Sequence, residues 1–453
     1  MDLKDRLVDL TDELTDVRPP VGLWDREVRR RRRARRDTIA VILVAVLAVA
    51  GVLTGSWRAS RQVAPVSPTG KTFLPDELFT PSKWLPGTDE GGELGPLIAA
   101  YPTSRGSWWG SRPGVVGVSA ATGEYRFLDL PDLADADIAL SPDGRQVAYW
   151  LRGGSSAAPN DRHLDTVTGI AVYDTSTGEV RRSPVATDHG LSPNTVFFAD
   201  ASTLVASFGQ WRGGYDDPPM EQASAADATP LVWRLDESTP VETGLHSSLD
   251  TNPAARAGRF WAGSRHSPLV DLTRVSGPTY RKLRLPYTPI GTIGSTSMGA
   301  LTLDARRLAV MASQRQPDRM PNAVTVYHIP PTPKPCCEAG HVVPNSRGTW
   351  AVIGWIDDQH VAIMRNQGRY EDISESGALF STDERTGEST QLVSMSRLGE
   401  GLNWIWALDL LGSPTGQGVE PPRPWDPRLV AGGIAGILMV SGLAVWLLRR
   451  RRG

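Results

Sequence analysis

The hydrophobic positions of this chain form two kinds of pattern. Residues 38–57 and 429–448 are apolar segments of twenty residues without a charge, and the region between them alternates short apolar runs with turn residues. A helix needs about twenty apolar residues to cross the hydrocarbon core of a bilayer. The pattern therefore predicts an all-β domain flanked by two transmembrane α-helices.

Arginine runs beside the two apolar segments predict their orientation. Residues 29–36 precede the first segment with seven arginines, and residues 449–452 follow the second with four. Because positively charged flanks stay in the cytoplasm, both termini are expected there and residues 58–428 outside, at the plasma membrane. Residues 48–50 (Ala-Val-Ala) have the form of a signal cleavage site, but a charged head of 37 residues favours an uncleaved anchor.

Residues 137–150 contain the clearest turn of the middle region. Two apolar runs flank Ser141-Pro142-Asp143-Gly144, in which proline presets one turn dihedral, aspartate bonds nearby backbone and glycine adopts a positive φ. This predicts a β-hairpin with an aspartate four residues before an apolar pair. The same offset occurs at Asp143, Asp200, Asp304 and Asp357. The intervals are 57, 104 and 53 residues, which predicts a degenerate copy near residues 256–261 and indicates a propeller or solenoid.

A second hairpin follows each copy. The predicted second hairpins lie at residues 170–180, 231–241, 269–283, 324–342 and 378–393. Four strands per repeat make the blade of a β-propeller, and five blades are complete between residues 137 and 393. A sixth is predicted to combine one strand from residues 402–411 with strands from residues 97–101, 114–120 and 124–130. Closure from both ends removes open sheet edges; a seven-bladed ring is the alternative.

One blade carries a family resemblance. Residues 140–149 (Leu-Ser-Pro-Asp-Gly-Arg-Gln-Val-Ala-Tyr) and 172–178 (Val-Tyr-Asp-Thr-Ser-Thr-Gly) resemble the TolB-like, WD40-related propeller repeat. The other copies keep the spacing and lose the Ser-Pro-Asp-Gly core. The resemblance implies a β-propeller in a membrane-anchored bacterial protein.

These patterns predict seven consecutive parts. They are a cytoplasmic head at 1–37, a transmembrane helix at 38–57, an extracytoplasmic stalk at 58–95, the propeller at 96–412, a Pro/Gly-rich linker at 413–428, a second transmembrane helix at 429–448 and a basic tail at 449–453. The stalk is expected to pack on the propeller through Phe73, Leu78, Phe79 and Trp84.

The cytoplasmic head begins with a short amphipathic pattern. Leucines at heptad-like spacing predict one apolar helix face, formed by Leu3, Leu7, Leu10 and Leu14. Because so short a helix is marginal alone, the face is expected to dock on a cytoplasmic partner. The head resembles those of single-pass bacterial proteins that act beside extracytoplasmic-function sigma factors, which implies a sigma factor as such a partner.

Small residues recur in both apolar segments. Gly51 and Gly55 in the first, and Gly432 and Gly436 in the second, form small-xxx-small steps that let helix backbones approach closely. They predict pairing of the two helices, although glycine is common in membrane helices generally.

Charge and chemistry narrow the function classes. Residues 58–428 hold 33 basic and 41 acidic side chains, an acidic balance that disfavours a nucleic-acid partner. The sequence contains no motif of a hydrolase, metalloprotease or phosphate-binding loop, and its seven histidines are scattered among the repeats. We therefore expect no catalytic, cofactor-binding or metal site, and interpret the repeated aspartates as turn residues.

The two cysteines are adjacent. Cys336 and Cys337 lie in the extracytoplasmic region, where thiols tend to oxidise, so a vicinal disulfide is predicted. Free thiols or a bridge to another chain are the alternatives.

Three function classes fit these features. The first is a binding, sensory or scaffolding module with a protein or peptide partner, coupled to the cytoplasm through residues 1–28. The second is a propeller hydrolase or lyase acting on an envelope glycan or peptide, and the third a structural component of an envelope complex. The missing catalytic motifs favour a protein that is not an enzyme.

Overall fold

The computed structural model describes residues 71–160, 166–217, 230–243, 254–261, 268–273, 278–283, 285, 299–312, 323–330, 340–366, 377–395 and 404–450. The chain divides into two compact units, one of residues 63–423 and one that includes the C-terminal helix. Each unit is described by itself.

Six sheets of four or five strands make up most of the described part of residues 63–423. Blade 1 contains β26 (Ile405–Trp406), β3 (Leu97–Ser107), β4 (Gly110–Ser119) and β5 (Tyr125–Phe127). Blade 2 contains β6 (Leu133–Leu140), β7 (Gln146–Arg152), β8 (Val167–Asp174) and β9 (Val180–Pro184). Blade 3 contains β10 (Leu191–Asp200), β11 (Thr203–Gln210), β12 (Leu231–Arg234) and β13 (Val241–Glu242).

The other three blades have the same order. Blade 4 contains β14 (Ala254–Arg256), β15 (Arg259–Trp261), β16 (Pro268–Asp271) and β17 (Thr279–Lys282). Blade 5 contains β18 (Gly299–Leu301), β19 (Arg307–Ala312), β20 (Ala323–His328) and β21 (His341–Val342). Blade 6 contains β22 (Thr349–Trp355), β23 (His360–Asn366), β24 (Gly377–Asp383), β25 (Ser389–Met395) and, parallel to β25, β2 (Glu77–Leu78).

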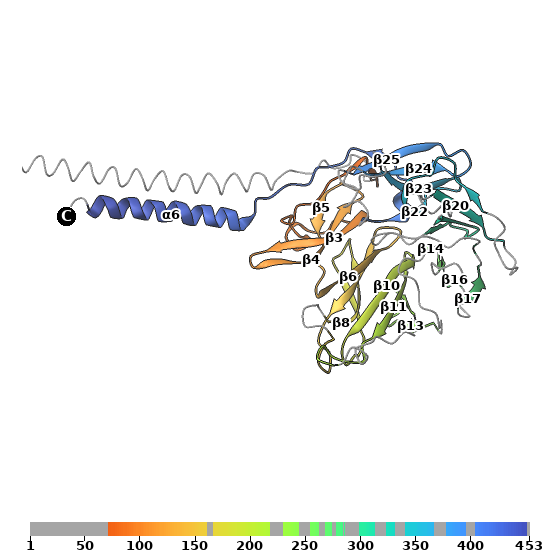
Figure 1. Cartoon of the computed structure of the whole chain (residues 1–453), viewed down its shortest axis with the longest axis horizontal. Helices are drawn as coiled ribbons and strands as arrows, with labels where there is room; N and C mark the ends of the chain where they lie inside the picture. The colour runs from red at the N-terminus through yellow and green to blue at the C-terminus, as the bar shows by residue number, and fades with distance from the viewer. Residues whose placement is uncertain are drawn as a thin grey trace, which may run out of the picture. The chain divides into compact units, whose positions relative to one another are not determined.

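The first strand of each blade lines the centre of a ring. Strand β6 contacts β10, β10 contacts β14, β14 contacts β18, β18 contacts β22, and β26 contacts β6. Figure 1 shows the blades following one another round this centre, from orange through yellow and green to blue. The chain is therefore a six-bladed β-propeller, as the repeats predict, and not the seven-bladed alternative.

The ring closes with strands from both ends of the propeller. Strand β26 pairs antiparallel with β3, opposing Ile405 to Ala100, and the Ala407 N–H donates to the Ile98 carbonyl at 3.0 Å. The predicted composition of the closing blade is confirmed. The strand lengths differ from the prediction: β26 gives way to a 3₁₀ turn, η1 (Leu408–Leu410), β3 extends to Ser107, β4 already begins at Gly110, and β5 covers three residues only.

Both faces of each blade are buried, because a blade lies between two neighbours. On β7, Tyr149 packs into the apolar cluster shared with blade 1, whereas the next residue, Trp150, packs into the cluster shared with blade 3. Successive side chains of a strand point to opposite faces, so a continuous apolar run serves both interfaces. Tyr149 and Trp150 are both fully buried.

The aspartates after the inner strands cap turns, as predicted. The Asp143 carboxylate accepts hydrogen bonds from the Ser141 hydroxyl at 2.6 Å and the Arg145 N–H at 3.1 Å. Gly144 has φ +75°, which suits a residue without a Cβ. Asp200, Asp304 and Asp357 accept backbone N–H groups in the same way.

The segment before the ring packs on it. Strand β1 (Leu74–Pro75) pairs in parallel with β27 (Thr415–Gly416), opposing Leu74 to Thr415. Leu74 and Leu78 are buried in the cluster that joins blades 6 and 1, and Phe79 packs against it. A short helix, α3 (Thr88–Gly91), follows. The chain therefore reaches and leaves the ring along adjacent paths.

In the other unit, helix α6 spans Pro427–Arg450. The preceding Asp426 carboxylate accepts the Arg428 N–H at 2.9 Å and Pro427 occupies the first turn, both usual helix-start features. Within the described residues, α6 is the one helix long and apolar enough to cross a membrane, with mean hydropathy 1.5 over residues 427–444. The other predicted span, residues 38–57, lies outside the described residues.

Candidate binding cavity in the propeller channel

The inner strands of all six blades enclose a cavity of about 140 Å³. Its walls are mostly apolar and backbone surfaces, among them Val196, Phe198, Leu301, Ile353 and Trp406. Among the described lining residues, Asp137 on β6 is the one with an ionisable side chain, and Thr195 on β10 adds a hydroxyl group. A cavity with apolar walls and a few placed polar groups is the usual form of a small-ligand site.

Asp137 lies in the wall at a local irregularity of β6. The register with β7 shifts between Leu133 and Ile138, so the backbone bulges next to Asp137. Its carboxylate is solvent-accessible and has no hydrogen-bond or ion-pair partner among the described residues. Desolvation by the surrounding protein raises the pKa of Asp137 above its ordinary value.

The two ends of the channel differ. All inner strands run in one direction, toward the face that carries the aspartate turns after them, which we call the turn face; the opposite face is the loop face. At the turn face, η1 contacts three alternate blades: its Asp409 N–H donates to the Pro142 carbonyl at 2.9 Å, the Asp409 carboxylate pairs with Arg256, and Leu408 lies against Gly354. Contacts with alternate blades place η1 across this end.

The pair of Arg256 and Asp409 fixes η1 in that position. The Arg256 Nη2 lies 2.8 Å from Asp409 Oδ1, and the arginine side chain is 7% exposed. Burial lowers the pKa of the Arg256 guanidinium, and the carboxylate of Asp409 opposes that shift. Because blade 4 lies across the ring from blade 1, this ion pair closes the turn-face end. Asp137 precedes Leu140 by three residues on β6, so it lies about 10 Å farther from the turn face, on the loop-face side.

The loop face carries the long connections between second and third strands. In blade 1 this connection is the hairpin tip between β3 and β4, where Trp108 is 57% and Trp109 99% exposed. Backbone hydrogen bonds join the described part of the blade 2 connection to its neighbours. The Ala157 N–H donates at 2.8 Å to the carbonyl of Asp188, which lies between β9 and β10, and the Tyr215 N–H of the blade 3 connection donates to the Pro159 carbonyl at 2.9 Å. These loops form the rim around the open end.

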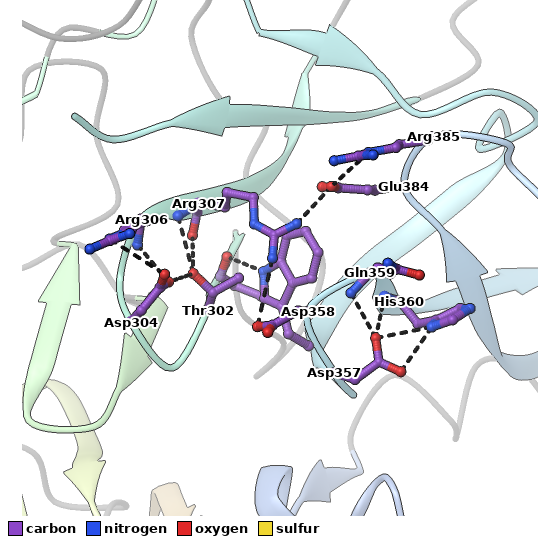
Figure 2. Close-up of polar contacts among 12 residues, drawn as sticks. Thr302, Asp304, Arg306, Arg307, Asp357, Asp358, Gln359, His360, Glu384 and Arg385 are labelled. Atoms are coloured by element: carbon purple, nitrogen blue, oxygen red, sulfur yellow. Dashed lines mark hydrogen bonds and ion pairs between the residues drawn. The ribbon is translucent and has the colours of Figure 1, made fainter. Parts of the chain in front are cut away.

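A second polar cluster joins blades 5 and 6 away from the cavity (Figure 2). Arg307 Nη1 lies 2.6 Å from Glu384 Oε1, and its Nη2 lies 3.7 Å from Asp358. The Glu384 side chain is 2% exposed, whereas that of Asp358 is 91% exposed. The guanidinium also lies over the Trp355 ring, 4.9 Å from its centroid. A buried ion pair on a blade interface indicates a structural role.

The other residues considered from the sequence divide into two groups. Trp404 is buried and stacks on Tyr101, with 4.8 Å between ring centroids. Gly432 and Gly436 lie on α6, and beyond the backbone of that helix no described atom lies within 4 Å of where a Cβ would stand on either glycine. The remaining candidates lie outside the described residues: Leu3, Leu7, Leu10, Leu14, Gly51, Gly55, Cys336 and Cys337. The leucine face, the helix pairing and the vicinal disulfide therefore stay predictions.

The histidines of the described blades do not gather at the cavity. His328 and His341 lie on neighbouring strands of blade 5, with ring centroids 6.2 Å apart, while His189 and His360 belong to blades 3 and 6 or their connections. Within the described residues, no group of three or more potential metal ligands comes together.

Comparison with known proteins finds only partial likeness to solved structures. No model of a known protein family matches the sequence, and no curated protein matches it. Similar solved structures include TolB from Acinetobacter baumannii, at 13% identity over 71% of this chain and 69% of that one, with a TM-score of 0.35. The β-propeller domain of the Trilobed protease from Pyrococcus furiosus is 11% identical over 69% and 84%, with a TM-score of 0.41.

A peptidase shows the same partial likeness. Pyrococcus horikoshii acylaminoacyl peptidase is 12% identical over 72% of this chain, which spans 46% of the peptidase, with a TM-score of 0.40. The class of this chain, a six-bladed β-propeller, therefore rests on its own strand order.

Proposed function

We propose that this protein is a membrane-anchored binding module whose propeller recognises a ligand or partner outside the cytoplasm. The central cavity carries the proposal: inner strands of six blades line it, η1 covers one end, and Asp137 contributes the one ionisable side chain among the described lining residues. Such a site binds by shape and by a few polar contacts.

Membrane anchoring has two sources of support. Helix α6 is long and apolar enough to span a bilayer, and residues 38–57 have the composition of a second span. The pairing of β1 with β27 leads the chain to and from the ring along adjacent paths, which suits two neighbouring spans with both termini in the cytoplasm.

The cytoplasmic head would transmit ligand binding to a partner in the cytoplasm. Residues 1–28 carry the predicted leucine face, which would dock on a cytoplasmic regulator such as a sigma factor. A hydrolase or lyase is the less favoured reading, because general acid and base chemistry would need a second ionisable group beside Asp137 and the described cavity wall offers none.

Photocrosslinking in intact cells tests the proposal. A photoreactive residue at position 109 samples the loop face, and one at position 358 samples the turn face as the matched control. We expect a defined partner to crosslink from position 109 and not from 358. Crosslinks from neither position would contradict recognition of a macromolecular partner at the loop face, and a phenotype unchanged by deleting residues 1–28 would contradict the reporting role.

A further inference from the structure

The cavity wall shows which chemical class of ligand it fits. Its volume of about 140 Å³ is close to that of an apolar protein cavity that holds benzene. The ligand portion inside is therefore small: one short alkyl or aromatic group.

The single carboxylate adds a charge requirement. Asp137 has no cationic or hydrogen-bonding partner among the described residues, although it stands in a wall that includes Phe197, Phe198 and Trp406. A carboxylate in such surroundings is costly to desolvate unless a cation accompanies it. Aromatic walls tolerate an organic cation better than a strongly hydrated metal ion.

We propose that the channel binds a primary ammonium group attached to a small apolar group, with Asp137 as its counter-ion and the inner-strand side chains around the apolar part. This deepens the binding role proposed above and rests on it. The same chemistry occurs in a free alkylamine and in the free amino terminus of a peptide whose first residue is apolar.

The channel geometry fits the amino terminus of a peptide as well as a free alkylamine. Since η1 and the pair of Arg256 and Asp409 cover the turn face, a ligand enters from the loop face and meets Asp137 before the apolar floor at Leu408. A peptide would enter by its end, with the rest of its chain on the loop-face rim.

Titration of the full-length protein in detergent tests the assignment, with n-butylammonium as the first probe and 1-butanol as its neutral counterpart. The peptide arm compares Leu-Gly-Gly carrying a free amino group with its N-acetylated form. The variants are Asp137→Asn, which keeps the shape and removes the charge, and Asp137→Glu, which keeps the charge. Asp236→Asn, at the exposed turn between β12 and β13, is the matched control.

We expect butylammonium to bind the wild type, Asp137→Glu and Asp236→Asn, and to bind Asp137→Asn about 10- to 100-fold more weakly, the loss of one charge-assisted hydrogen bond. Butanol should not distinguish the variants. If the free peptide binds more tightly than butylammonium and the acetylated one does not bind, the source is a peptide terminus; the reverse order indicates a small amine.

Equal binding of butylammonium to wild type and Asp137→Asn, or no binding to the wild type, overturns the assignment. Thermal unfolding of each variant checks that the ring is intact. A partner crosslinked from position 109 in intact cells would then leave the binding role standing while the ammonium assignment fails.

Discussion

Replacing Arg307 by methionine should destabilise the propeller strongly, because it removes one partner of a buried ion pair. The Arg307 guanidinium lies 2.6 Å from Glu384, whose side chain is 2% exposed. Methionine keeps the apolar stem and the contact with Trp355, but it leaves the buried Glu384 carboxylate with Arg385 alone as counter-charge, a side chain that is 80% exposed and whose Nε lies 3.9 Å away. Stranding a buried charge costs about 3–5 kcal/mol, a large part of the roughly 5–15 kcal/mol typical of a folded domain.

The exposed second partner of Arg307 provides the control. Asp358 pairs with Arg307 at 3.7 Å but is 91% exposed, so Asp358→Asn should cost no more than about 1 kcal/mol. The double variant Arg307→Met with Glu384→Met removes both charges and should be more stable than Arg307→Met alone, since no charge is left unpaired.

Urea unfolding of the full-length chain in mild detergent, followed by tryptophan fluorescence, measures these free energies. The expected order of stability is wild type, then Asp358→Asn, then the double variant, then Arg307→Met. A cost for Arg307→Met no greater than that for Asp358→Asn, or a double variant as unstable as the sum of its single changes, would refute the reasoning.

Two further predictions concern the turns. Gly144→Ala should lower the free energy of unfolding by at least about 2 kcal/mol, because φ is +75° and a Cβ would clash with the Leu97 carbonyl oxygen. Gly154 lies in open space, so Gly154→Ala should change that free energy by no more than about 0.5 kcal/mol in the same assay. Burial alone would raise the pKa values of Asp304 and Asp357, but hydrogen bonds to their carboxylates outweigh it and hold both pKa values below the ordinary range. The stabilisation by these two carboxylates is thus present above the unfolded pKa of about 3.9 and is lost as pH falls through the folded pKa. Replacing both by Asn should therefore make the urea midpoint fall less steeply between about pH 5 and 2. An equal fall in wild type and variant would count against this prediction.

The ring could be predicted from the sequence because its signals are local. Apolar runs of strand length and an aspartate turn recur at a regular interval, and the turn chemistry around Asp143 is set by residues within a few positions. The closing strand at Ile405 and Trp406 followed from the need to pair the open edge of the first blade.

The cavity could not be predicted in the same way. Asp137 looks like any aspartate of a hairpin, and its place in the wall depends on the bulge of β6 and on the five other inner strands. Arg256 and Asp409 lie far apart in sequence and meet only after the ring closes, so no spacing rule indicates their pairing. The 3₁₀ turn of η1 falls where the leucine-rich pattern predicted a longer strand.

The most direct test of the account is a disulfide across the closing pair of strands. Ala100→Cys and Ile405→Cys are opposed in register, within the Cα separation that a disulfide bridges, and Cys336 and Cys337 are first replaced by serine. Oxidation should form an intrachain bridge that shifts the mobility of the full-length chain on a non-reducing gel. Thr103→Cys with Ile405→Cys, three residues out of register, should not bridge. Absence of the first bridge, or equal yields from both pairs, would contradict closure of the ring by β26 and β3.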